Sequence, residues 1–143
     1  MSIAAATRLL IIRHGETAWN AERRIQGHTD IPLNDTGRQQ ARALAEALND
    51  SPIHAVYCSD LQRAEETGRI TAASHDARVI TTSQLRERHF GHIEGKTFID
   101  FEVHFPDESM RWRKRDPNWA PPGGGESLAD LRDRIVQTVN DIG

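Results

Sequence analysis

The sequence has few of the features that mark membrane proteins, nucleic-acid binders or disulfide-bonded secreted proteins. Its 143 residues include one cysteine, Cys58, which excludes an internal disulfide and favours a reducing compartment, the cytoplasm. The net charge of −3 requires no basic surface, so nucleic acid is not an expected partner. The apolar run at residues 9–12 ends at Arg13, too short for a membrane span, and residues 1–12 lack the basic start and cleavage site of a signal peptide. We expect one ordinary soluble domain.

Three short apolar segments predict the strands of a parallel sheet. These segments are residues 9–12, 54–60 and 77–82. Amphipathic helical segments separate them, and this alternation is typical of an α/β sheet with parallel strands. Ligands bind such sheets at the carboxyl ends of the strands. Arg13 and His14 follow the first strand and Arg63 follows the second, so we expect these three side chains at one edge of the sheet.

The predicted helices begin at polar residues that can act as N-caps. Thr36, with Gln39 three residues later, has the pattern of a capping box for the first long helix. Ser59 or Asp60 is expected to cap the next one. The last helix carries an apolar stripe of Leu128, Leu131, Ile135, Val139 and Ile142. Between these helices, residues 84–118 are irregular and are expected to cover the site as a loop with short helices.

The end of the sequence interrupts this alternating order. Gly143 comes directly after the last predicted helix, where another strand is expected. Three strands also make a narrow sheet for the helices that cover it. We therefore expect a single domain, residues 1–143, that lacks its C-terminal strands.

The segment RHG at the first strand end has the residue types of a nucleophilic phosphate site. His14 can attack through a free ring nitrogen if its ring is neutral and aimed. Gly15 lets the backbone turn sharply and leaves space beside the ring. The planar guanidinium groups of Arg13 and Arg63 can each match two phosphate oxygens, so the expected target is a phosphoryl group.

Further residues on the loops can complete this chemistry. Asn20, Gln26 and Gly27 offer neutral hydrogen-bond donors. An ester leaving group also needs a proton, and the segment LRERHFGHIEG supplies the carboxyl groups of Glu87 and Glu94. We choose Glu87 as the general acid, with Glu94 as the fallback. Once ionised, the same carboxylate can activate the water that cleaves phosphohistidine.

Four ordered motifs, LLIIRHGETAWN, CSDLQRAEET, LRERHFGHIEG and GGGESLADLRDR, resemble the histidine phosphatases of the phosphoglycerate mutase superfamily. The resemblance runs over nearly the whole chain. It implies that His14 is the phosphorylated nucleophile, that Arg13, Arg63 and Asn20 bind phosphate, and that Glu87 donates the proton. It also implies a three-layer α/β/α sandwich with a mostly parallel sheet, and no required metal or cofactor. A second catalytic histidine, which members carry on a later strand, is absent from this chain.

Each candidate also has a simpler interpretation. His14 can be a structural histidine at a strand end, Arg63 a solvated helix charge, and Glu87 one member of a surface ion network. His89 and His92 suggest a metal pair, but no third ligand accompanies them at a suitable spacing. Cys58 lies four residues before Arg63 without the intervening glycine of a cysteine-phosphatase loop, so a buried strand residue is expected.

One charge run is left with two equal interpretations. Residues 111–115, RWRKR, form either a solvated surface or a grip for a second anionic group of the substrate, with Trp112 and Trp119 as a pocket wall.

These observations predict a phosphomonoester hydrolase that works through phosphohistidine on a small phosphorylated metabolite. One alternative is a cofactor-dependent mutase, which returns the phosphoryl group to another oxygen of the same molecule. Another is a non-catalytic module that binds phosphorylated ligands. A homo-oligomer in which a second chain completes the sheet is the third. The expected partner is the small substrate, with no nucleic acid and no membrane.

Overall fold

The computed structural model describes residues 6–143; residues 1–5, part of the segment considered above for a signal peptide, lie outside the described residues. Within the described range two strands, with one helix between them, stand among helices on either side in the sequence. Their bounds are α1 Ala18–Ala21, α2 Asp35–Ala47, β1 Ala55–Ser59, α3 Gln62–Ala72, β2 Arg78–Thr82, η1 Ser83–Leu85, η2 Gly91–Ile93, α4 Phe98–His104, α5 Pro106–Lys114 and α6 Leu128–Ile142. None of the described helices is long and apolar enough to cross a membrane.

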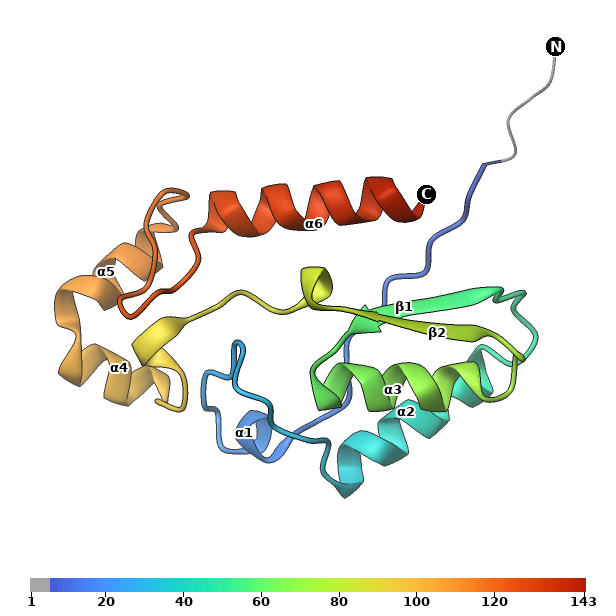
Figure 1. Cartoon of the computed structure of the whole chain (residues 1–143). Helices are drawn as coiled ribbons and strands as arrows, with labels where there is room; N and C mark the ends of the chain where they lie inside the picture. Colours follow the sequence, from blue (N-terminus) through green and yellow to red (C-terminus); the bar gives the residue numbers. More distant parts are fainter. Residues whose placement is uncertain (1–5) are drawn as a thin grey trace, which may run out of the picture.

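The strands β1 and β2 form a parallel pair, joined by α3. The register runs from Ala55 opposite Arg78 to Ser59 opposite Thr82. Helix α3 packs on both strands and α2 packs on α3, while α6 lies on the opposite side of the strands (Figure 1). The predicted α/β arrangement, with helices on both sides of a parallel sheet, is therefore confirmed.

The predicted first strand at residues 9–12 is not formed, and this prediction is wrong for the structure. All four side chains are exposed, and Ile11 retains 94% of its surface. A strand needs backbone hydrogen bonds to a neighbour. Among the described residues, no backbone hydrogen bond joins residues 6–15 to another backbone segment. The apolar run predicted a buried strand, but in the structure it makes no backbone hydrogen bond to either edge of the β1–β2 pair.

Both predicted N-caps are also wrong. Helix α2 starts one residue before Thr36, and the side chain of Asn34 caps it by accepting a hydrogen bond from the Gly37 N–H at 2.8 Å. Helix α3 has Leu61 at its N-cap position with no side-chain hydrogen bond. The carboxylate of Asp60 instead accepts from the guanidinium of Arg86. Both outcomes involve tertiary contacts: the Asn34 amide also donates to the Glu16 carboxylate at 2.9 Å, and Asp60 is engaged by Arg86.

The segment 84–118 contributes most of the main apolar cluster of the described chain. Its buried members are Ile25, Ile93, Phe101 and Trp119, with Phe90, Phe105 and Trp112 packed around them. Because Trp119 is only 3% exposed inside this cluster, it is core and not a pocket wall. In the RWRKR run, Arg111 pairs with Asp116 and Arg113 with Glu102, which favours a solvated charge run.

The apolar stripe of α6 is present but incompletely covered. Leu128, Leu131, Ile135, Val139 and Ile142 are all half-buried, and no residue of the helix is fully buried. The Ser127 side chain caps the helix by accepting from the Asp130 N–H at 3.0 Å. From this helix, Arg134 reaches back to the segment that carries Glu87.

Candidate active site

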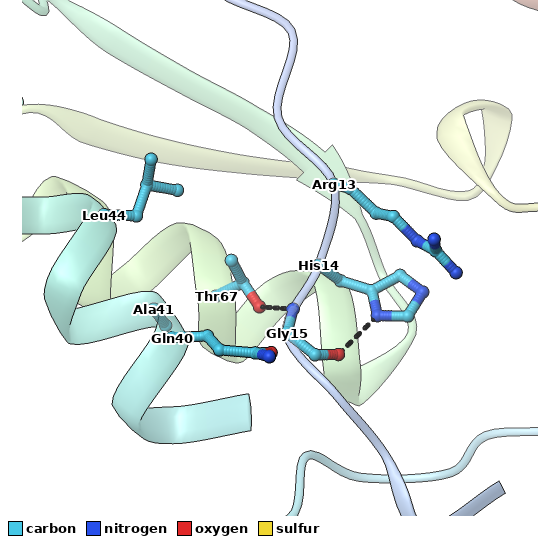
Figure 2. A pocket seen from close by; sticks show the side chains of 7 residues that line it. All are labelled: Arg13, His14, Gly15, Gln40, Ala41, Leu44 and Thr67. Carbon is cyan, nitrogen blue, oxygen red and sulfur yellow. Dashed lines mark hydrogen bonds between the residues drawn. The ribbon is translucent and has the colours of Figure 1, made fainter. Parts of the chain in front are cut away.

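His14 is held through one ring nitrogen, and no hydrogen bond to the other is found within residues 6–143. Its Nδ1 lies 2.7 Å from the carbonyl oxygen of Gly15, and because a carbonyl oxygen only accepts, Nδ1 carries the proton of the neutral ring (Figure 2). The Nε2 atom therefore holds the lone pair. The next peptide is anchored in turn, since the Gly15 N–H donates to the Thr67 hydroxyl at 3.1 Å. In Figure 2 the ring points away from Ala41 and Leu44 of α2.

The surroundings of His14 favour its neutral form. Burial lowers its pKa from the ordinary 6.5, and the positive charges of Arg63 and Arg13 lower it further. The Gly15 carbonyl and the negative charge of Glu87 act in the opposite direction without reversing the shift. The ring is therefore neutral at pH 7, which is the form a nucleophile requires.

Nuclear magnetic resonance tests both statements directly. We expect long-range proton–nitrogen correlations at pH 7 to show His14 with its proton on Nδ1, and the ring to titrate below pH 6.5 because burial penalises the imidazolium. A proton on Nε2, or titration above pH 6.5, would contradict this arrangement.

Arg63 lies in the first turn of α3 and is almost completely buried, with 2% of its surface exposed. One guanidinium nitrogen donates to the Thr29 carbonyl at 2.9 Å and the other to the Gly27 carbonyl at 2.6 Å. Burial lowers its pKa, and the charge of Glu87 partly compensates. The two bonds fix the plane of the guanidinium and leave its other N–H groups to an anion.

Two of the predicted neutral donors, Asn20 and Gln26, are both hydrogen-bonded to the buried Thr17 hydroxyl. Thr17 donates to the Gln26 Oε1 at 2.6 Å, and Asn20 Oδ1 accepts from the Thr17 N–H at 3.1 Å as part of a capping box for α1. Among the described residues, no hydrogen bond uses the amide NH₂ of Asn20 or Gln26, so these groups keep donors for a ligand. Gly27 has φ +61° and gives its carbonyl to Arg63, so it supports the arginine.

Glu87 and Arg13 are exposed and lie near the other charged groups. The charge of Glu87 acts on both His14 and Arg63, and that of Arg13 acts on His14. The Glu87 carboxylate accepts from the Arg88 N–H at 2.7 Å and makes no ion pair within the described residues, which argues against a surface ion network. The structure thus places Arg13, Arg63 and Glu87 close enough to His14 for their charges to affect its pKa.

The family model that matches this chain describes the histidine phosphatase superfamily, branch 1, and covers residues 9–143. The chain belongs to this superfamily. It is 44% identical over 137 residues to phosphoglycerate mutase-like protein 4 of Arabidopsis thaliana, over 94% of this chain and 60% of that protein. It is 38% identical over 135 residues to glucosyl-3-phosphoglycerate phosphatase of Mycolicibacterium vanbaalenii, over 94% of this chain and 59% of that protein.

The solved structures agree with this assignment. A mycobacterial glucosyl-3-phosphoglycerate phosphatase complexed with VO3 superposes with a TM-score of 0.81 at 36% identity, over 90% of this chain and 61% of that one. The predicted family and its phosphoglycerate mutase-like fold are confirmed. This chain spans about 60% of the length of the relatives it matches.

Other residues of this histidine phosphatase chain have structural roles. The carboxylate of Glu94 accepts from the backbone N–H groups of His28, Phe90 and Thr29 and from the Thr29 hydroxyl, so it organises the loop that holds Arg63. Burial raises the pKa of the Cys58 thiol, which disfavours a nucleophilic thiolate. No group of metal-ligating side chains is found among residues 6–143.

Gly15 of the RHG segment has a different role from the predicted one. Its φ is not positive, so no left-handed turn requires glycine. A Cβ at this position would instead collide with the backbone carbonyl of Gly37 in the first turn of α2. The close approach of the two glycines places His14 beside α2, and a hollow of about 100 Å³ lies there, lined by residues that include Gln40 and Leu44.

Thr67 is a site residue that the sequence did not reveal, because a threonine inside a helix has no distinctive local signature. Its hydroxyl donates to the Arg63 carbonyl at 2.7 Å and accepts from the Gly15 N–H. It thereby joins the Gly15 backbone, directly after His14, to the backbone of the buried Arg63.

Replacing this hydroxyl tests the link. We expect Thr67→Val to reduce the free energy of unfolding by about 1–3 kcal/mol, because the buried Gly15 N–H loses its partner. Urea unfolding measures the loss, and Thr67→Ser, which keeps the hydroxyl, should recover most of it. Equal stability of the valine variant and the wild type would show that the hydrogen bond contributes nothing.

Proposed function

We propose that the protein is a phosphomonoesterase that acts through a phosphohistidine intermediate on a small phosphorylated metabolite. The observation that carries the proposal is the neutral His14 with Nε2 free, beside the buried guanidinium of Arg63. Relatives named as a glucosyl-3-phosphoglycerate phosphatase and a metal-independent phosphoserine phosphatase support the hydrolytic assignment. The single buried cysteine supports a cytoplasmic location.

In the first step, Nε2 of His14 attacks phosphorus and the ester P–O bond breaks. The leaving oxygen takes a proton from the carboxyl group of Glu87, while Arg13, Arg63 and Asn20 bind the phosphoryl oxygens. In the second step, water attacks phosphorus, the carboxylate of Glu87 accepts its proton, and the P–N bond breaks. Inorganic phosphate leaves and His14 returns to its neutral form.

Phosphate release from 4-nitrophenyl phosphate at mildly acidic pH, with a chelator present, tests the proposal. We expect turnover that vanadate inhibits, in keeping with the VO3 complex of the mycobacterial relative. A folded protein that binds vanadate but releases no phosphate would instead support the binding module.

The second candidate is a phosphoglycerate mutase-type transfer, which the 44% identity to a phosphoglycerate mutase-like protein favours. Phosphorus NMR of a reaction with a phosphoglycerate separates the two activities. A phosphatase accumulates inorganic phosphate, whereas a mutase accumulates the positional isomer.

A further inference from the structure

Arg134 of α6 binds the segment that carries Glu87. Its Nη1 donates to the backbone carbonyls of Gln84 at 2.7 Å and Arg86 at 2.9 Å, and its Nη2 lies 3.4 Å from the carbonyl of Glu87. Only 17% of its side chain is exposed. One guanidinium therefore contacts three carbonyls on the approach to the proposed proton donor.

Glu126 orients that guanidinium and holds the other side of Glu87. Its two carboxylate oxygens accept from Nε and Nη2 of Arg134, each at 2.8 Å. One of them also lies 3.3 Å from the His89 N–H, and the Glu126 N–H donates to the His89 carbonyl at 2.8 Å. Its backbone carbonyl accepts from the Arg88 side chain at 2.7 Å. Together, Arg134 and Glu126 hold the backbone from residue 84 to residue 89.

Glu87 has little else to fix its position. Its side chain is exposed and, within the part of the chain that the structure describes, accepts one hydrogen bond, from the adjacent Arg88 N–H. Its carbonyl accepts from the His28 ring at 2.9 Å as well as facing Arg134. A proton donor must be placed within hydrogen-bond reach of the leaving oxygen, so the direction of this carboxyl group depends on the backbone that carries it.

We propose that Arg134, oriented by Glu126, is a positioning residue that holds Glu87 in place for proton transfer to the leaving group. The inference rests on the proposed function, because it assigns Arg134 to the proton-donating step of that reaction. A purely structural ion pair would affect stability and all substrates alike. A positioning residue affects most strongly the substrates whose leaving group needs the proton.

The test compares two aryl phosphates that differ in the leaving group. 4-Nitrophenolate is a weak base and leaves without being protonated, whereas the more basic phenolate needs a proton as it leaves. For Arg134→Met we expect kcat/KM to fall about tenfold or more on phenyl phosphate and less than about threefold on 4-nitrophenyl phosphate. Arg134→Lys keeps the charge but lacks the planar guanidinium that bonds several acceptors at once, so we expect the same difference between the two substrates. The matched control is Arg132→Met on the same helix, where an exposed arginine pairs with the neighbouring Asp133; turnover of neither substrate should be affected.

The outcomes separate the two claims. Glu87→Gln must give the same split, of about 10²-fold on phenyl phosphate. If Glu87→Gln gives this split but Arg134→Met lowers kcat/KM equally on both substrates, or on neither, the positioning role of Arg134 is wrong. If the wild-type protein releases no phosphate, the proposed function fails. Amide hydrogen exchange then tests separately whether Arg134 holds the backbone around Glu87. Arg134→Met should then speed exchange at Arg86 and His89 while Arg132→Met does not, and unchanged exchange at both amides would overturn it.

Discussion

Replacing His14 with alanine is expected to lower phosphate release from 4-nitrophenyl phosphate by about four orders of magnitude or more, because a covalent pathway disappears with its nucleophile. Arg63 and the loop donors would still bind the phosphoryl group, so vanadate binding should be retained. Steady-state kinetics measures the first quantity and calorimetry the second. Loss of turnover with retained binding assigns His14 to the chemical step.

The control for this variant is a second histidine in a similar local setting. His104 donates its Nδ1 proton to the Asp100 carbonyl at 2.8 Å, much as His14 does to Gly15, but it lies exposed at the end of α4. His104→Ala should leave turnover unchanged. We expect both alanine variants to unfold within about 1 kcal/mol of the wild type, because each loses one local hydrogen bond. Equal activity of His14→Ala and wild type would remove His14 from the mechanism.

Replacing Arg63 with methionine is expected to damage both stability and catalysis. The carbonyls of Gly27 and Thr29 lose their charged donor inside the protein, so the free energy of unfolding should fall by about 2–4 kcal/mol. The phosphoryl group loses a preorganised donor, so kcat/KM should fall by about 10³-fold. Arg63→Lys keeps the charge but not the planar guanidinium with its several N–H donors, and we expect it to recover only part of either loss.

A matched control for Arg63 lies on the same helix. Arg69 pairs with Glu65 one turn away and is 59% exposed, so Arg69→Met should change the free energy of unfolding by less than about 0.5 kcal/mol. Urea unfolding and phosphate-release kinetics on the four proteins provide the comparison. If Arg63→Met were as stable and as active as Arg69→Met, the account of the buried guanidinium would be wrong.

The sequence predicted the parts of the fold and site that depend on local pattern. The strands around Val56 and at residues 77–82 appear as β1 and β2, and the crossover helix between them appears as α3. This crossover places Arg63 where its charge acts on His14, although 49 positions separate them in the sequence.

The remaining features depend on distant neighbours that no local pattern specifies. Residues 9–12 have the composition of a buried strand, but strand formation needs a partner for backbone hydrogen bonds. Gly15 meets the backbone of Gly37, and Thr67 bonds to Gly15, so both roles exist only in the folded chain. The hold of Arg134 on residues 84–87 likewise links segments about fifty positions apart.

The central claim is that the phosphoryl group is transferred to Nε2 of His14. The most direct measurement traps this intermediate: the protein is mixed with 4-nitrophenyl phosphate, quenched in alkali, in which a phosphoramidate survives, and analysed by mass spectrometry and phosphorus NMR. The account predicts one phosphoryl group on Nε2 of His14, absent from His14→Ala. Phosphate release without a phosphoenzyme, or with the phosphoryl group on Nδ1 or on another residue, would contradict it.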